Sequence, residues 1–436
     1  MAAGRSGARR AVPGAGLRGA RVTAVPGNRW DLLPEPSGPV PTVGVVVCHY
    51  EQPEQLARTV AAVHRQTRPP VAVVVADDGS ARPPDPATLA GPVPLQVLGQ
   101  DDRGFRAAAA RNLGAARCDG DVLVFLDADT VPEPGFIDAL TRRIRACPDV
   151  LAVGRRRHAD LSGTEPGTDP ARAPRLPEPR WLADGYRGSR DLLDADGRSF
   201  RFVISAVLAL HRTLFDDIGG FDERFVGYGG EDWDLAYRAW NNGALLVHEP
   251  GAVAWHDGPD WAGRPGPGKD GEAMRLAALV PEPGTRGAPL PGAVPDVLAD
   301  PGPGLTGTAL VRTVDSVLRQ THRDVRVRLP GGDDRITELY RGVADTAPWS
   351  ADRVRRARAR LEVHAPLPPD ALATAMDLMV RHDLGRVEIV GAGHDRLAVL
   401  GAARAAGRAR RHGVGGAEAQ WREGTATLRV DDRTGG

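Results

Sequence analysis

The chain has 436 residues, enough for two or three domains that each bury a hydrophobic core. Its 56 Lys and Arg residues balance its 56 Asp and Glu residues, so no net field draws it to nucleic acid, and we expect no nucleic-acid partner. No apolar run approaches the roughly 20 residues of a membrane-spanning helix, so any membrane contact would be peripheral. Three cysteines without metal-site spacing indicate a reducing, cytoplasmic setting.

The first part of the chain predicts strands that alternate with helices. Residues 1–40 mix Gly, Ala, Pro and Arg without apolar periodicity, which indicates a flexible leader. A buried strand over residues 43–48 follows, then a helix with apolar residues at helical spacing from Leu56, then a second strand over residues 71–76. Because a strand, a helix and a strand in this order connect through a right-handed crossover, the pattern predicts a parallel sheet.

The second strand ends at Asp77-Asp78-Gly79-Ser80. Carboxylates at such a place commonly accept hydrogen bonds from a ribose hydroxyl or a base N–H, and the alternative is an ordinary Asp-Gly turn. After a short strand near residues 95–98, Arg106 and Arg111 bracket the alanine-rich start of a helix. Their guanidinium groups are suited to phosphate or base contacts, and the alternative is a solvated helix face.

The apolar strand over residues 122–126 delivers Asp127-Ala128-Asp129 at its end. In an open α/β sheet, ligands bind at the carboxyl ends of the strands, so both carboxylates would face the crevice. Mg²⁺ or Mn²⁺ accepts one or two protein carboxylates and takes its other oxygens from water and phosphate. The pair therefore suits a cation that holds a diphosphate, although Asp also begins turns after strands.

Two further motifs follow an apolar strand predicted over residues 202–210. A glycine-rich loop opens a helix whose first turn carries Glu231 and Asp232, where acids also cap the positive end of the helix dipole. An acid beside a sugar pocket is suited to deprotonating a hydroxyl. His256 ends a later strand, where it is either a third metal ligand or a structural histidine.

Density of Gly and Pro marks a domain boundary after this region. We predict a catalytic domain over residues 41–260, a linker over residues 261–304 with one short helix near residues 274–279, and a C-terminal domain over residues 305–436.

The C-terminal domain carries a partial internal repeat. Residues 56–67 match residues 310–321 at a constant offset of 254. The acids are missing from the second copy, because Gly331-Gly332 stand for Asp77-Asp78, and Gly391-Ala392-Gly393 are the predicted counterpart of Asp127-Ala128-Asp129. We interpret this domain as a degenerate, non-catalytic repeat, the alternative being chance similarity between two amphipathic helices followed by strands.

Taken in order, the motifs over residues 42–258 resemble family 2 glycosyltransferases with the GT-A fold. The Gly-Gly-Glu-Asp segment with a later His is most similar to the branch of galactosyltransferases and N-acetylgalactosaminyltransferases. The resemblance implies a mixed, mainly parallel sheet flanked by helices, a diphosphate–metal site at Asp127 and Asp129 assisted by His256, and a catalytic base at Asp232. Glu231 would hold hydroxyls of the donor or the acceptor.

The resemblance also implies a nucleotide site at Asp78, with Arg106 and Arg111 nearby. The family's Pro-Thr-Tyr after the first strand is Cys48-His49-Tyr50 here, so that only the tyrosine is retained.

These observations predict inverting transfer of a sugar from a nucleotide-diphosphate donor, with UDP as the expected nucleotide, to a hydroxyl of a glycan, a lipid-linked acceptor or a small molecule. Mn²⁺ or Mg²⁺ would be the cofactor. One alternative is a sugar nucleotidyltransferase, but the glycine-rich phosphate loop of such enzymes is missing after the first strand. The other is a non-catalytic glycan-binding scaffold, which the retained acids of the first half argue against.

Overall fold

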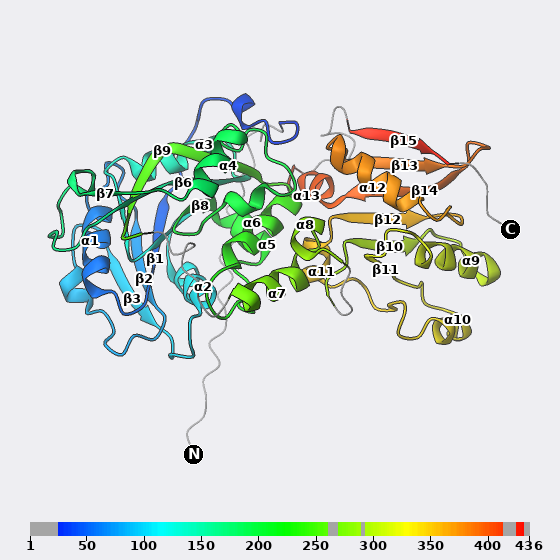
Figure 1. The fold of residues 1–436 in the computed structure, drawn as a ribbon, viewed down its shortest axis with the longest axis horizontal. Helices are drawn as coiled ribbons and strands as arrows, with labels where there is room; N and C mark the ends of the chain where they lie inside the picture. Colours follow the sequence, from blue (N-terminus) through cyan, green and yellow to red (C-terminus); the bar gives the residue numbers. More distant parts are fainter. Residues whose placement is uncertain (1–24, 260–268, 289–292, 413–423, 431–436) are drawn as a thin grey trace, which may run out of the picture.

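The computed structural model describes residues 25–259, 269–288, 293–412 and 424–430. Two α/β domains lie side by side, each built on its own sheet and its own hydrophobic core (Figure 1). Residues 1–24 of the predicted leader and parts of the predicted linker lie outside the described residues.

The first domain contains a nine-stranded sheet with the order β3-β2-β1-β4-β8-β6-β9-β5, in which β7 pairs with β6. Its strands are β1 (Val43–His49), β2 (Ala72–Asp77), β3 (Leu95–Gly99), β4 (Val122–Asp127), β5 (Thr130–Pro132), β6 (Val150–Ala159), β7 (Arg175–Leu176), β8 (Val207–His211) and β9 (Leu245–Asp257). Parallel pairs join β3, β2, β1 and β4, whereas β8 runs antiparallel to both of its neighbours. The predicted parallel sheet is therefore confirmed at this end, and the complete sheet is mixed.

Helices flank this sheet, and α5 and α6 lie on the side of the second domain (Figure 1). The helices are α1 (Pro53–Val63), α2 (Ala107–Arg117), α3 (Phe136–Ala146), α4 (Arg180–Gly188), α5 (Arg212–Ile218) and α6 (Glu231–Asn241), with the 3₁₀ turns η1 (Trp30–Leu32), η2 (Pro86–Leu89), η3 (Pro170–Arg172) and η4 (Ser199–Phe202). The strand predicted over residues 202–210 begins only at Val207, because η4 and a turn occupy the preceding residues.

The second domain contains a six-stranded sheet with the order β11-β10-β12-β14-β13-β15. Its strands are β10 (Val297–Pro301), β11 (Val325–Val327), β12 (Ala359–Val363), β13 (Arg386–Val390), β14 (Arg396–Ala402) and β15 (Thr425–Arg429). Its helices are α9 (Gly307–Leu318), α10 (Asp334–Leu339), α11 (Ala351–Arg356), α12 (Ala371–Arg381) and α13 (Ala403–His412). Each neighbouring pair of strands has the same direction as its counterpart in the series β2-β1-β4-β8-β6-β9 of the first sheet.

The equivalence of the two sheets extends to side chains that follow α1 and α9. Gln66 bonds to the carbonyls of residues 62 and 133 and to the amide of residue 137. Gln320, 254 positions later, makes the matching bonds to residues 316, 368 and 372.

One predicted equivalence is wrong. Gly391-Ala392-Gly393 follow β13, which corresponds to β6, whereas the counterpart of β4 is β12. Val43 pairs with Val122 and Val297 pairs with Ala359, so His364 occupies the register position of Asp127, five residues further on.

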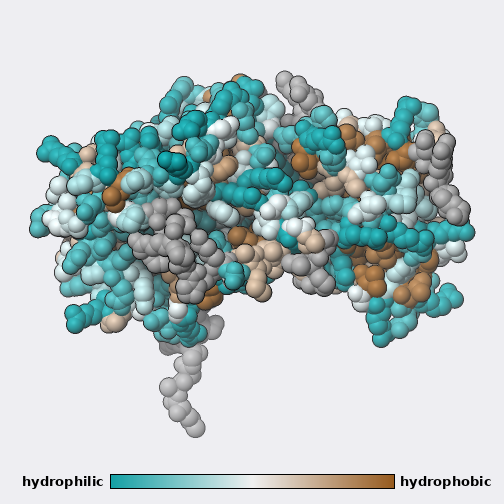
Figure 2. All heavy atoms as spheres, in the orientation of Figure 1, coloured by the Kyte–Doolittle hydropathy of each residue, from teal (hydrophilic) through white to brown (hydrophobic). Residues whose placement is uncertain are grey.

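The predicted linker is partly structured, since it contains α7 (Lys269–Leu279), α8 (Pro283–Arg286) and β10. The described end of the predicted leader is also packed, because the Asn28 amide donates to the carbonyls of Leu192 and Leu246. The three cysteines are free. Within the described ranges, every helix falls short of the length and apolar character that crossing a membrane requires. The face in Figure 2 is mostly hydrophilic, with several hydrophobic patches over the second domain.

Candidate active site

A cleft of about 570 Å³ opens at the carboxyl ends of β1, β2 and β4, beside the end of β9. Six of the residues predicted from the sequence line it: Tyr50, Asp78, Arg111, Asp127, Asp129 and His256. Their convergence follows from topology, because parallel strands bring their carboxyl ends to one edge of the sheet.

Asp78 is buried at the end of β2, where protein donors hold its carboxylate in place. One oxygen accepts from the Gln100 amide, and the other accepts from the backbone N–H of Arg106 at 2.6 Å. The guanidinium of Arg106 instead bonds to the carbonyl of Asp101. The structure therefore brings the backbone of Arg106, not its charge, to the predicted nucleotide site.

Arg111 joins two of the predicted motifs. Its guanidinium donates to Asp127 at 2.7 Å and to Glu231 at 2.9 Å. The side chain is 5% exposed, so these contacts are made largely away from water. Through Arg111, the first acid at the end of β4 and the first turn of α6 become parts of one charged cluster.

Asp129 and His256 lie side by side in the cleft, with Oδ2 and Nε2 3.5 Å apart. The Nδ1 atom of His256 lies 3.1 Å from the carbonyl of Gly258, which can only accept, so Nδ1 carries the proton. Nε2 is therefore the ring nitrogen available to a metal ion beside the Asp129 carboxylate. Burial raises the pKa of Asp129, His256 opposes this rise, and Asp127 adds to it.

The three predicted ligands do not form a finished metal centre. Across the described ranges, no group of three or more His, Cys, Asp or Glu side chains is placed to hold a metal. The reason is local: Asp127 turns toward Arg111, which neutralises it. The donor set still fits Mn²⁺ or Mg²⁺, because two carboxylates and one imidazole nitrogen stand at the mouth of a cleft that is large enough for phosphate oxygens.

The first turn of α6 carries the predicted catalytic acids. Asp232 accepts from its neighbour's amide, Trp233 N–H, at 2.8 Å and more weakly from Ser205 N–H at 3.4 Å. Burial and the negative charge of Glu231 raise the pKa of Asp232 to about 7. Such a value suits a general base near neutral pH. Glu231 and Asp232 are not among the residues that line the cleft, and Glu231 reaches it through Arg111.

Several residues of the cleft were missed from the sequence. Gln52 donates to Asp129 at 3.3 Å, and Arg156 lines the cleft from β6. Phe105 and Tyr228 lie at the cleft with ring centroids 5.8 Å apart, each more than 40% exposed. A signal existed for Arg156, since consecutive arginines inside a buried strand are costly unless they reach a ligand or a partner.

Comparison with known proteins agrees with this arrangement. Residues 44–218 match the model of glycosyl transferase family 2, and residues 198–251 match a model described as the N-terminal domain of galactosyltransferase. The mixed, mainly parallel sheet has the GT-A fold, and these matches make the first domain similar to glycosyltransferase domains. More specifically, residues 44–218 are similar to family 2 glycosyltransferases.

Individual relatives cover only part of the chain. The hyaluronan synthase of Pasteurella multocida is 26% identical over 257 residues, which is 54% of this chain and 26% of that protein. The pre-mycofactocin glycosyltransferase of Mycobacterium tuberculosis is 33% identical over 186 residues, 42% of this chain and 37% of that protein. The chain thus spans less than half the length of either relative. The structure of GalNAc-T7 with UDP, GalNAc and Mn²⁺ aligns with 54% of this chain and 48% of that chain, at 19% identity and a TM-score of 0.40.

Proposed function

We propose that the chain catalyses inverting transfer of a hexose from a nucleotide-diphosphate donor to an acceptor hydroxyl. The observation that carries the proposal is the bridge through Arg111, which links Asp127 at the diphosphate end of the cleft to Glu231, next to Asp232. This bridge couples a site for the leaving group to a carboxylate with a pKa of about 7.

In the proposed reaction, Asp232 accepts the proton of the acceptor hydroxyl as its oxygen attacks the anomeric carbon. The bond to the diphosphate breaks on the opposite face of the sugar, so the anomeric configuration inverts. Arg111 offers positive charge near the departing diphosphate and holds Glu231 toward the sugar. Asp78 would hold the ribose or the base, and Tyr50 would contact the nucleoside from the loop after β1.

A divalent cation held by Asp127, Asp129 and His256 would neutralise the charge that develops on the diphosphate. Rotation of Asp127 away from Arg111 would complete the ligand set. We expect Mn²⁺ or Mg²⁺, because carboxylate and phosphate oxygens are the ligands that these ions prefer.

Two features support a hexose as the transferred group, and UDP is the nucleotide that we propose. The match of residues 198–251 to a galactosyltransferase model covers the Gly-Gly-Glu-Asp segment, and the relatives include a hyaluronan synthase and a glycosyltransferase. The proposed acceptor is a glycan, a lipid-linked sugar or a small molecule with a free hydroxyl.

The second domain is proposed to be a degenerate, non-catalytic copy of the first. It keeps the strand order and the glutamine contacts, but His364 and Pro366 occupy the register positions of Asp127 and Asp129. A cation bound by carboxylates therefore has no counterpart at this place.

A donor screen tests the function. UDP-, GDP- and TDP-hexoses would be incubated with Mn²⁺ and a panel of sugar acceptors, and the anomeric configuration of the product would be read by NMR. We expect metal-dependent transfer from a UDP-hexose with inversion. Retention of configuration would overturn the mechanism, turnover of a nucleoside triphosphate with a sugar phosphate would indicate a nucleotidyltransferase, and absence of Mn²⁺-dependent UDP binding would indicate a scaffold.

A further inference from the structure

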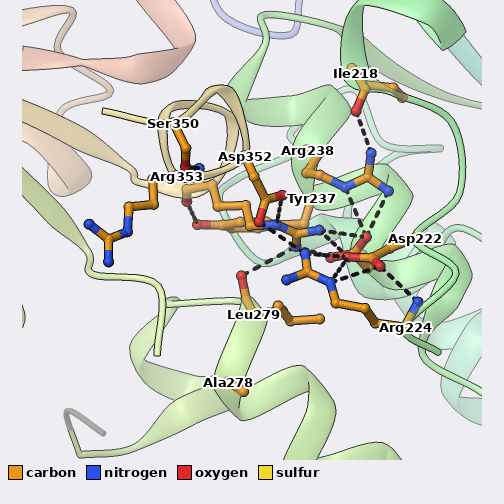
Figure 3. A network of polar contacts seen from close by, with 12 residues as sticks. Ile218, Asp222, Arg224, Tyr237, Arg238, Ala278, Leu279, Ser350, Asp352 and Arg353 are labelled. Carbon is orange, nitrogen blue, oxygen red and sulfur yellow. Dashed lines mark hydrogen bonds and ion pairs between the residues drawn. The ribbon is translucent and has the colours of Figure 1, made fainter. Parts of the chain in front are cut away.

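A buried arginine of the second domain forms ion pairs and hydrogen bonds with the helix that carries the proposed base. Arg356, the last residue of α11, is 1% exposed in its side chain. Its guanidinium pairs with Asp234 in the first turn of α6, with Asp222 at 2.6 Å, and with Asp352 of its own helix at 2.7 Å. Figure 3 shows how Asp222, Asp352 and the side chains of α6 converge on this point.

Asp234 is fully buried, and two arginines pair with its carboxylate. Besides Arg356, it accepts from Arg238 at 2.8 Å, one turn further along α6. Arg238 also donates to the carbonyl of Ile218 at the end of α5. Because a buried carboxylate without a partner is strongly disfavoured, Asp234 ties the first turn of α6 to both α5 and the second domain.

The backbone of Arg356 makes a second set of bonds to the same helix. Its carbonyl accepts from the hydroxyl of Tyr237 at 2.6 Å and from the amide of Asn241 at 3.2 Å. One residue of the second domain therefore contacts α6 near its start, middle and end.

Two arginines of α13 hold the far end of α6. Arg404 stacks on Trp240, with the guanidinium carbon 3.4 Å from the ring centroid, and donates to the carbonyl of Ala244 at 2.7 Å. Arg408 donates to the carbonyl of Gly243 at 3.0 Å. These two carbonyls lie just after α6, and Arg404 also donates to the carbonyl of Trp240 in its last turn at 3.3 Å. A helix C-terminus leaves such acceptors without partners, and cations are favourable there.

We propose that the second domain positions the catalytic helix, and that Arg356 is the positioning residue. Glu231 and Asp232 lie on the same turn as Asp234, so fixing Asp234 fixes the direction of both acids relative to the cleft. The inference rests on the proposed role of Asp232. It gives the second domain a role in catalysis, the positioning of α6, for which the second domain does not need to bind a ligand.

The test compares three variants of the full chain. Arg356→Met removes the charge, Arg356→Lys keeps it but cannot bridge Asp222 and Asp234 together, and Arg358→Met is the matched control. Arg358 lies two residues further on, and its guanidinium bonds to both carboxylate oxygens of Asp296 within the second domain. The readouts are kcat, donor KM, the Kd of UDP with Mn²⁺, and hydrogen exchange of the amides of residues 231–241.

For Arg356→Met, we expect kcat to fall about 100-fold, because a displacement of about 1 Å of a catalytic group has effects of this size. Donor KM and the Kd of UDP should change much less than kcat, since Asp78, Asp129 and His256 do not touch this network. Asp127 is linked to it only indirectly, through Arg111 and Glu231. The amides of α6 should exchange faster. Arg356→Lys should recover part of kcat, and Arg358→Met should keep both kcat and the exchange pattern of α6.

Wild-type kcat in a folded Arg356→Met chain would overturn the inference, as would an equal loss of kcat in Arg358→Met. If Arg356→Met does not fold, the comparison of Arg356→Lys with Arg358→Lys decides in the same way. Failure of the proposed function is distinguishable, because the wild-type chain would then transfer no sugar while hydrogen exchange would still report whether Arg356 fixes α6.

Discussion

Replacing the proposed base by its amide, Asp232→Asn, isolates the proton transfer. An Asn side chain has the same shape, and its oxygen can still accept from the Trp233 amide, the shorter of the two backbone bonds at 2.8 Å. Only the weaker bond from Ser205, at 3.4 Å, is lost. We therefore expect the variant to fold and to bind its donor as the wild type does.

The expected loss is in kcat. General-base assistance contributes about 10²–10⁴-fold, which corresponds to about 3–5 kcal/mol of activation free energy. The wild-type rate should rise with pH through a pKa of about 7, because only the deprotonated carboxylate accepts the proton. Below that value the rate should fall about tenfold per pH unit, and Asp232→Asn should lack this limb.

The assay is initial-rate transfer from pH 5.5 to 8.5, with calorimetry of UDP and Mn²⁺ on both proteins. Glu231→Gln tests the direction of the pKa shift. Because the charge of Glu231 raises the pKa of Asp232, removing that charge should move the acidic limb of the pH–rate profile to lower pH. If Asp232→Asn kept near-full transfer with intact donor binding, the assignment of the base would be refuted.

Three further predictions concern the cleft and its supports. Asp129→Asn should weaken Mn²⁺-dependent UDP binding, measured by calorimetry, at least about tenfold, because even groups that only orient a metal ligand have effects of this size. His364→Ala in the second sheet should leave UDP binding unchanged. Arg111→Met should lower the free energy of unfolding in urea by about 3–5 kcal/mol, because Asp127 and Glu231 lose their shared cation, and a change as small as that of the exposed Arg103→Met would contradict the bridge. Gly230→Ala should cost about 1–3 kcal/mol in the same assay, because φ is +92° there and a Cβ would meet Phe225 at 2.7 Å; unchanged stability would show that the loop relaxes freely.

The sequence was sufficient for the elements that form the donor half of the cleft. The strands β1, β2 and β4 are buried on both faces, so they are continuous apolar runs, and the acids that end β2 and β4 stand out. Parallel topology then brings Asp78 and Asp127 to one edge without further information. The same reasoning fails for β12, because its residues alternate between buried and exposed, and the more apolar β13 is more similar to β4 in sequence.

Contacts between distant segments left no local signal. Arg356 and Asp234 are 122 positions apart, and Arg111 and Glu231 are 120 positions apart, so neither pair follows from spacing along an element. The sequence indicated the acids of α6 as a group, but it did not indicate which partner each acid contacts. The structure assigns Glu231 to Arg111 and Asp234 to Arg356, and it leaves Asp232 with two backbone donors.

The energetics of the domain boundary explain why a sheet that lacks counterparts of Asp78 and Asp127 can still matter to the chemistry. Arg404 and Arg408 are buried beside each other, and burial together with Arg408 lowers the pKa of Arg404 well below its ordinary value. Two such cations are costly unless acceptors surround them, and the acceptors here are carbonyls at the end of α6 and of the segment before β1. If the domains separated, both arginines would lose these hydrogen bonds. The first turn of α6 would also be exposed at Asp234. The two domains are therefore expected to unfold as one cooperative unit, with the helix of the proposed base at its centre.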